Sequence, residues 1–222
     1  MNRKKDIIDS IMKISGKYSP YEVFNDWIRC MAISISNSVN LSHNKIWQDR
    51  ENMYLDTMKR YSKDERMILC EMMAFLCETF DDGPDDVLGD IYMKSGMGSK
   101  ITGQFFTPFH ISVLLATMSL EDSIKSFDGK MTELNEPSCG GGGMIIASAK
   151  VLHDAGIDYQ RNMRVVAQDL DWKSVYMCYV QLSLLGIDAI CIQGDTLADP
   201  YIPGRTDPAH ILITPARAGM LI

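Results

Sequence analysis

Hydrophobic residues in the first 80 positions recur three and four residues apart, which is the spacing of amphipathic helices that bury one face. Breaks in this pattern fall near Gly16, at Pro20 and at the acidic turn 81–84. We therefore predict four helices, over residues 7–14, from Pro20 onward, over residues 43–61 and over residues 64–80. Together they would form an N-terminal helical domain of residues 1–100.

The pattern changes after residue 100, where short apolar runs alternate with helical stretches. The runs at residues 132–134, 164–167, 189–192 and 210–213 have the length and composition of buried strands. Helices are predicted over residues 110–118, after the glycines at 140–143, and over residues 172–185. Alternating strands and helices are typical of an α/β domain with a parallel sheet, so we assign residues 101–222 to such a domain.

Composition and cysteine usage indicate a cytoplasmic protein in a reducing compartment. The 222-residue chain is 46% hydrophobic, enough for a sizeable core, with no apolar run of membrane-spanning length and no signal peptide behind its charged N-terminus. Its six cysteines include no CxxC pair, so neither a zinc site nor a disulfide framework is predicted. We expect no metal site and no membrane association.

The net charge of −7 is spread over both parts of the chain. Residues 1–100 carry 14 basic and 16 acidic side chains, and residues 101–222 carry 8 basic and 13 acidic ones. No cluster of Lys and Arg follows residue 66. Because non-specific DNA affinity arises mainly from the neutralisation of phosphates, we expect this chain to bind DNA tightly only with a partner.

Residues 134–150 combine the end of a predicted strand, four glycines at 140–143 and an alanine-rich helix. In open α/β sheets, this arrangement brings the N–H groups of a helix N-terminus close to a ligand. The dinucleotide fingerprint does not fit, because Ile145 or Ile146 occupies its third glycine position, and the P-loop pattern GxxxxGK[ST] is absent. A cofactor site and a tight structural turn both remain open here.

Polar side chains follow the predicted strands: Glu136, Asp169, Asp195 and Thr214. The carboxyl ends of parallel strands share one edge of a sheet, so we expect these four residues at one ligand-binding edge. Three carboxylates suit a nucleoside with ribose hydroxyls and an amine better than a triphosphate. The aromatic pair Phe105 and Phe106, beside Thr107, either covers such a ligand or fills the seam between the two domains.

Five short motifs occur in order along residues 85–214: DVLGDIY, GQFFTP, NEPSCGGGGM, AQDLD and GDTL. Their order and spacing resemble the modification (M) subunits of type I restriction-modification systems, an adenine-specific DNA methylase family. The resemblance implies a Rossmann-like S-adenosylmethionine-dependent methyltransferase sheet, present in part and preceded by an N-terminal helical bundle. It also implies S-adenosylmethionine as the cofactor and contact with DNA through a specificity partner subunit.

Position by position, the resemblance assigns the cofactor contacts. Glu136 matches the acid that faces the methionine end of the cofactor, Asp169 the acid that holds the ribose hydroxyls, and Asp195 the acid that contacts the adenine amine. Gly141 stands where the family more often has Ser. The expected cofactor-binding residues are Phe105, Phe106, Thr107, Glu136, Ser138, Gly140, Gly142, Asp169, Leu170, Asp195 and Thr196.

The family's catalytic motif, Asn-Pro-Pro-aromatic, is degenerate in this sequence. The predicted strand 210–213 runs into TPAR, so Thr214 and Pro215 take the catalytic positions without an Asn or an aromatic ring for the flipped adenine. Two functions stay open: methyl transfer to the exocyclic amine of adenine in DNA, or a catalytically inactive relative that binds the cofactor or a protein partner. The helices of residues 7–80 are the expected surface for homo-oligomers or for a partner subunit.

Overall fold

The computed structural model describes residues 2–95 and 105–220. Its N-terminal part contains the four predicted helices: α1 (Arg3–Ile14), α2 (Pro20–Val39), α3 (Lys45–Met58) and α4 (Lys63–Thr79). Ser19 and Ser62 begin α2 and α4 with capping boxes, in which the serine and a glutamate three residues later satisfy free N–H groups. The prediction of an N-terminal helical region is confirmed, with α3 shorter at both ends than expected.

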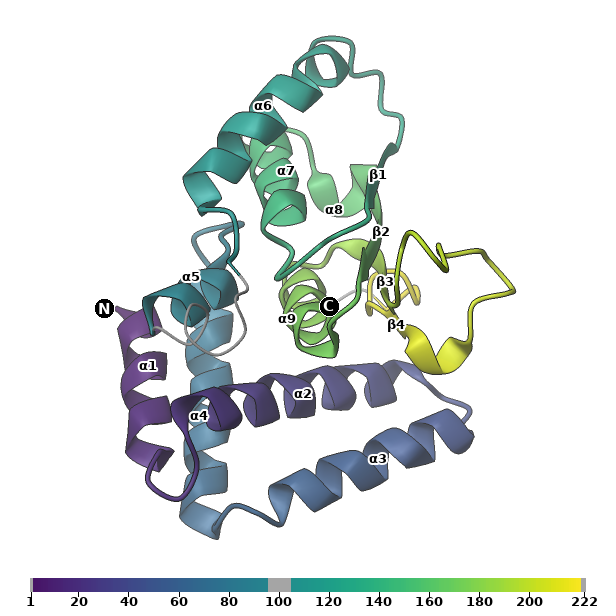
Figure 1. Cartoon of the computed structure of the whole chain (residues 1–222). Helices are drawn as coiled ribbons and strands as arrows, with labels where there is room; N and C mark the ends of the chain where they lie inside the picture. The colour runs from purple at the N-terminus through teal and green to yellow at the C-terminus, as the bar shows by residue number, and fades with distance from the viewer. Residues whose placement is uncertain (1, 96–104, 221–222) are drawn as a thin grey trace.

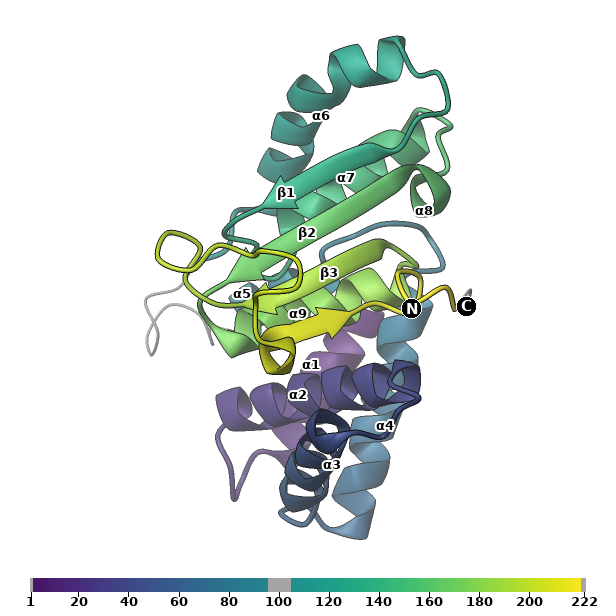
Figure 2. The ribbon, with the colours of Figure 1, turned by 90° about the vertical axis from the view of Figure 1, so that its right-hand side faces the viewer.

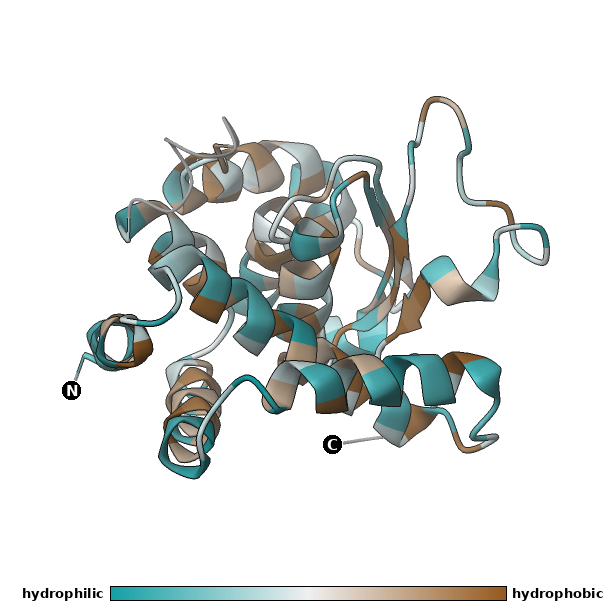
Figure 3. Cartoon of the chain, turned by 60° about the horizontal axis from the view of Figure 1, so that its bottom comes forward, coloured by the Kyte–Doolittle hydropathy of each residue, from teal (hydrophilic) through white to brown (hydrophobic). Residues whose placement is uncertain are grey.

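Hydrophobic and hydrophilic residues alternate along the helices of this bundle (Figure 3), and the helices pack through their apolar faces. α1 lies along α4 and α2 along α3, and α2 also contacts α9 (Trp172–Leu184) from the second half of the chain (Figure 1). Phe24, Trp27 and Ile28 of α2 are almost fully buried. One cluster of buried hydrophobic residues runs through both halves, so the domain boundary at residue 100 stays a prediction.

The second half of the chain forms a sheet with the strand order β1-β2-β3-β4. The strands are β1 (Thr132–Glu136), β2 (Met163–Asp169), β3 (Asp188–Gln193) and β4 (Ile211–Ile213). β1, β2 and β3 run parallel, and α7 (Gly143–Asp154) and α9 cover the same face of the sheet (Figure 2). α6 (Phe109–Lys125) packs on α7. The predicted α/β fold is confirmed.

Two helices were not expected from the sequence. α5 (Val87–Lys94) begins at Asp86, whose side chain accepts a hydrogen bond from the backbone N–H of Gly89. The short helix α8 (Tyr159–Asn162) leads directly into β2, and a 3₁₀ turn (Pro208–His210) leads into β4. α5 lies beside α9, and its N-cap residue Asp86, in the DVLGDIY motif, lies next to the glycine loop, residues 140–143.

The prediction that the fourth strand is parallel to the others is wrong, because β4 pairs antiparallel with β3. A parallel neighbour requires a crossover, usually helical, that carries the chain back along the sheet. Residues 194–210 contain only the 3₁₀ turn and return the chain beside β3 in the opposite direction. The carboxyl end of β4 therefore lies beside the amino end of β3, away from Glu136 and Asp169.

Across the residues that the structure describes, no helix has both the length and the apolar character needed to cross a membrane. All six cysteines are free thiols. Cys139, Cys178 and Cys191 are buried between the glycine loop, α9 and β3.

Candidate cofactor site

The loop between β1 and α7 needs glycine at two positions. Gly140 and Gly142 have φ angles of 51° and 93°, in the left-handed region that other residues rarely adopt. A Cβ on Gly142 would lie 3.1 Å from the sulfur of Cys178, and one on Gly140 would lie 3.1 Å from the ring of Phe106. Because Gly142 is also the N-cap of α7, the first turn of that helix has no side-chain cap, and its N–H groups are available to a ligand.

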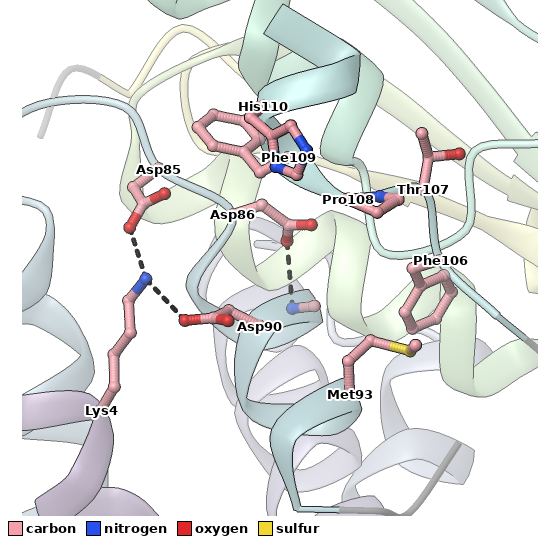
Figure 4. Close-up of a pocket in the computed structure, with 11 residues that line it drawn as sticks. Lys4, Asp85, Asp86, Asp90, Met93, Phe106, Thr107, Pro108, Phe109 and His110 are labelled. Carbon is pink, nitrogen blue, oxygen red and sulfur yellow. Dashed lines mark hydrogen bonds and ion pairs between the residues drawn. The ribbon is translucent and has the colours of Figure 1, made fainter. Parts of the chain in front are cut away.

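A cavity of about 250 Å³ lies against this loop. Its lining includes six of the residues expected from the sequence: Phe105, Phe106, Thr107, Ser138, Gly140 and Asp169. An adjoining cavity of about 400 Å³ lies between α1, α5 and the start of α6 (Figure 4). Asp86, Phe106 and Thr107 border both, so the two spaces meet at these side chains.

Phe106 reconciles the two interpretations of the aromatic pair. Its ring lies 5.3 Å from the ring of Tyr92 on α5, centroid to centroid, so it fills the seam between the helical part and the glycine loop. The same side chain borders both cavities. Phe105 is 65% exposed and borders the smaller cavity, where a ligand could cover it.

Asp169 holds the glycine loop to the end of β2. One carboxylate oxygen accepts a hydrogen bond of 2.8 Å from the N–H of Gly140, and the other accepts one of 3.0 Å from the N–H of Asp171. Each oxygen retains a lone pair for a further donor. Asp169 also borders the smaller cavity, and its contact with a ligand stays a prediction.

Glu136 lies near Asp169 but does not border either cavity. Its carboxylate accepts a weak hydrogen bond of 3.3 Å from the N–H of Ser138. Burial, with a smaller contribution from the charge of Asp169, raises the pKa of Glu136. The two carboxylates expected at the ends of β1 and β2 are thus close together, as predicted, with Asp169 nearer to the open space.

Asp195 and Thr196 form hydrogen bonds within and beside their own loop and do not border the cavities. The carboxylate of Asp195 accepts hydrogen bonds from the N–H groups of Leu197 and Ala198, at 2.9 and 3.3 Å. The hydroxyl of Thr196 donates to the carbonyl of Pro137 at 2.6 Å and ties this segment to the end of β1. Neither residue borders the two cavities, and the same holds for Leu170, which is 67% exposed.

The prediction that Thr214 lies at the ligand-binding edge is wrong. Its hydroxyl is fully buried, donates to the carbonyl of Ile187 at 2.7 Å and accepts from the N–H of Ala189 at 3.0 Å. Pro215 is buried beside it. Because β4 is antiparallel, both residues lie at the amino end of β3, so neither is placed to contact a substrate at the glycine loop.

Sequence reasoning missed Asp86, although it lies in the DVLGDIY motif. This carboxylate is only 4% exposed, and one oxygen accepts hydrogen bonds from the N–H of Gly89 and the amide of Gln181. Burial raises the pKa of Asp86. The Gln181 amide also donates to the carbonyl of Gly141, which connects Asp86 to the glycine loop. A Cβ on Gly89 would lie 2.2 Å from Asp86, which explains the glycine in this motif.

Known proteins share both the fold and the sequence pattern. A crystal structure from Listeria monocytogenes, assigned as a class I S-adenosylmethionine-dependent methyltransferase, is similar with a TM-score of 0.57 and 13% identity. The similarity covers 90% of this chain and 54% of that one, so this chain spans about half the length of that structure. No curated protein sequence is significantly similar to the chain.

The sequence model of a family described as N-6 DNA methylase matches residues 84–215. This range contains all five motifs, the glycine loop and the residues that line the smaller cavity. The adenine-specific methylase family expected from the motifs is therefore confirmed. Because the match covers more than half of the sequence, the chain belongs to the N-6 DNA methylase family.

Proposed function

We propose that the cavity at the glycine loop binds S-adenosylmethionine, and that the chain acts as the modification subunit of a cytoplasmic restriction-modification system that methylates adenine in DNA. The observation that carries the proposal is the convergence of Phe106, Asp169 and the uncapped start of α7 on one cavity. Family membership supports the same activity class.

The residues that line the site fit this cofactor. Small-molecule sites usually enclose about 300–1,000 Å³, and the two adjoining cavities together fall in this range. Asp169 has lone pairs for ribose hydroxyls, and Phe106 offers an aromatic face that attracts a cation such as a sulfonium. The sulfonium of the bound cofactor would supply the methyl group, while these side chains hold and orient it.

The groups that hold the target adenine of the DNA are proposed to come from a partner in the assembled enzyme. Supporting this, the hydroxyl of Thr214 is occupied by the backbone of β3 at the opposite end of the sheet. The same observation favours the second candidate function, a catalytically inactive relative that binds the cofactor or a partner protein. Transfer of the methyl group, measured directly, separates the two.

Contact with DNA is likewise proposed to depend on a specificity partner, because acidic side chains outnumber basic ones in both parts of the chain. We propose the N-terminal helices as the surface for this partner or for a second copy of the chain. An apolar groove of about 240 Å³ between α2, α3 and α4, bordered by Trp27, Leu55 and Met73, supports this role.

The experiment that tests the proposed activity uses S-adenosylmethionine with a labelled methyl group and duplex DNA. Label incorporated into adenine by the chain together with a specificity subunit, but not by the chain alone, is the expected result. Cofactor binding with no transfer under either condition would leave only the inactive relative. A chain that binds no cofactor would contradict methyl transfer and the cofactor-binding relative, and would leave only a relative that binds a partner protein.

A further inference from the structure

A buried hydroxyl on α6 lacks a partner at the edge of the smaller cavity. The Ser112 side chain has no exposed surface and borders this cavity, yet its oxygen forms no hydrogen bond. Serine and threonine within helices commonly donate to the carbonyl four residues earlier, as Thr117 does to Val113 at 2.8 Å. Ser112 does not. Among the buried polar atoms of the described residues that lack a partner, the Ser112 oxygen is the one whose residue borders this cavity, where a ligand would supply the missing hydrogen bond.

A buried carboxylate borders the cavity from α5. One oxygen of Asp86, Oδ1, accepts both hydrogen bonds that this side chain forms with described residues, from Gly89 and Gln181. The nearby ammonium group of Lys4 binds Asp85 and Asp90 instead, at 2.6 and 3.1 Å (Figure 4). A carboxylate removed from water is destabilised unless a cation or further donors approach it. Asp86 Oδ2 is therefore an acceptor without a donor in the described structure.

The two groups point to one place, the first residue of α7. A Cβ built on Gly143 would lie 3.0 Å from Asp86 Oδ2 and 3.9 Å from Ser112 Oγ. This point also lies at the uncapped helix N-terminus, where N–H groups attract negative charge. The subsite thus combines an acceptor for a cation with donors for an anion. That combination is complementary to the ammonium and carboxylate of an α-amino acid.

We propose that Asp86, Ser112 and the first turn of α7 bind the amino-acid end of S-adenosylmethionine. Asp86 Oδ2 accepts a hydrogen bond from the α-ammonium, and the Ser112 hydroxyl donates to the α-carboxylate together with the N–H groups of α7. This inference rests on the proposed function. It differs from the family resemblance, which assigns the methionine end to Glu136, a residue outside both cavities.

The test compares two probes by calorimetric titration: S-adenosylmethionine, and 5′-methylthioadenosine, which has the same nucleoside but no amino-acid chain. Ser112→Ala is expected to weaken binding of S-adenosylmethionine roughly 10- to 150-fold, the loss typical of one hydrogen bond to a charged group. Asp86→Asn is expected to weaken it at least as much, because the ion pair is lost. Neither variant should change the affinity for 5′-methylthioadenosine.

Two controls keep folding separate from binding. Ser112→Ala removes an unpaired hydroxyl, so its melting temperature should equal or exceed that of the wild type, whereas loss of a structural contact would lower it. Ser148 borders neither cavity, and its buried hydroxyl donates to the carbonyl of Met144, so Ser148→Ala should leave both affinities unchanged.

The outcomes distinguish this inference from the proposed function. Wild-type protein that binds neither probe would overturn both. Wild-type protein that binds S-adenosylmethionine, with Ser112→Ala and Asp86→Asn binding it equally well, would overturn only the amino-acid subsite. Equal losses for both probes in the two variants would also overturn it, because the residues would then act on the nucleoside or on the loop.

Discussion

Among single residues, Gly142 is the clearest case of backbone geometry that only glycine provides. Alanine at this position would have to adopt a φ of 93° and would approach the sulfur of Cys178 to 3.1 Å. We expect Gly142→Ala to lower the free energy of unfolding by about 1–3 kcal/mol, the usual cost of a left-handed residue with added crowding. Urea denaturation measures this change.

Gly129 provides the matched control for that substitution. It has a similar φ of 86°, but a Cβ there would meet nothing within 4 Å. Gly129→Ala should therefore show the conformational cost alone, and Gly142→Ala should be the more destabilising of the two. Equal effects would mean that the glycine loop does not require the close approach to α9 described above.

The buried carboxylate of Asp86 makes stability depend on pH. Burial raises its pKa in the folded protein above the unfolded value of about 3.9, so between these two values the folded state binds more protons. Its contribution to stability is therefore present at low pH and is lost as pH rises through the folded pKa. Asp86→Asn, which does not titrate, should become more stable relative to the wild type over that interval.

Urea denaturation of both proteins between pH 4 and about pH 8 measures this difference. Saturating S-adenosylmethionine should reduce the pH dependence, because an ammonium beside Asp86 favours its charged form. If the two proteins differ in free energy of unfolding by the same amount at every pH, burial does not raise the pKa of Asp86.

At the level of elements, the hydroxyl of Thr214 anchors β4 to β3. Thr214→Val keeps the shape of the side chain but leaves the N–H of Ala189 without its acceptor, which should cost about 1–3 kcal/mol of unfolding free energy. Thr117→Val, on the exposed side of α6, should cost less than about 0.5 kcal/mol.

The affinity of Thr214→Val for S-adenosylmethionine should equal that of the wild type, since Thr214 lies at the far end of the sheet from the glycine loop. Denaturation and calorimetry on the same preparations decide the point. Tenfold weaker cofactor binding without any loss of stability would instead indicate that Thr214 lies at the ligand-binding edge, as the sequence suggested.

The direction of β4 also shows where sequence reasoning stopped. Hydrophobic periodicity located the four bundle helices and all four strands, because burial of one face or of a short run leaves a local pattern. Strand direction depends on the path of residues 194–210, which carries no such pattern. The motifs likewise selected Asp169 and Phe106, which border the smaller cavity, whereas the local hydrogen bonds of Asp195 became visible only in three dimensions.

Asp86 and Ser112 were missed for a related reason. Asp86 ends an acidic run just before α5, and Ser112 lies in the largely apolar helix α6; the sequence alone does not reveal that either side chain is buried beside a cavity. Their convergence on Gly143 depends on the packing of α5 and α6 around α7, elements that are separated along the chain. Burial and hydrogen bonding, not residue type, distinguish them from ordinary helix-capping and core residues.

For the whole molecule, the balance of charged side chains predicts the affinity of the chain for duplex DNA. Residues 101–222 carry 8 basic and 13 acidic side chains, so the α/β part offers little to neutralise phosphates. We expect the chain alone to bind duplex DNA more weakly than micromolar at physiological salt, with further weakening as salt increases. Fluorescence anisotropy with a labelled duplex measures this, and micromolar or tighter binding would contradict the proposed need for a specificity partner.

The central claim, a cofactor site at the glycine loop, is tested most directly by calorimetric titration of S-adenosylmethionine into the wild type, Asp169→Ala and Asp122→Ala. The wild type should bind saturably at one site, and loss of the Asp169 carboxylate should weaken binding by about 1.5–3 kcal/mol. Asp122→Ala removes the same charge from the exposed side of α6 and should bind like the wild type. No binding by the wild type, or unchanged affinity in Asp169→Ala, would contradict the account.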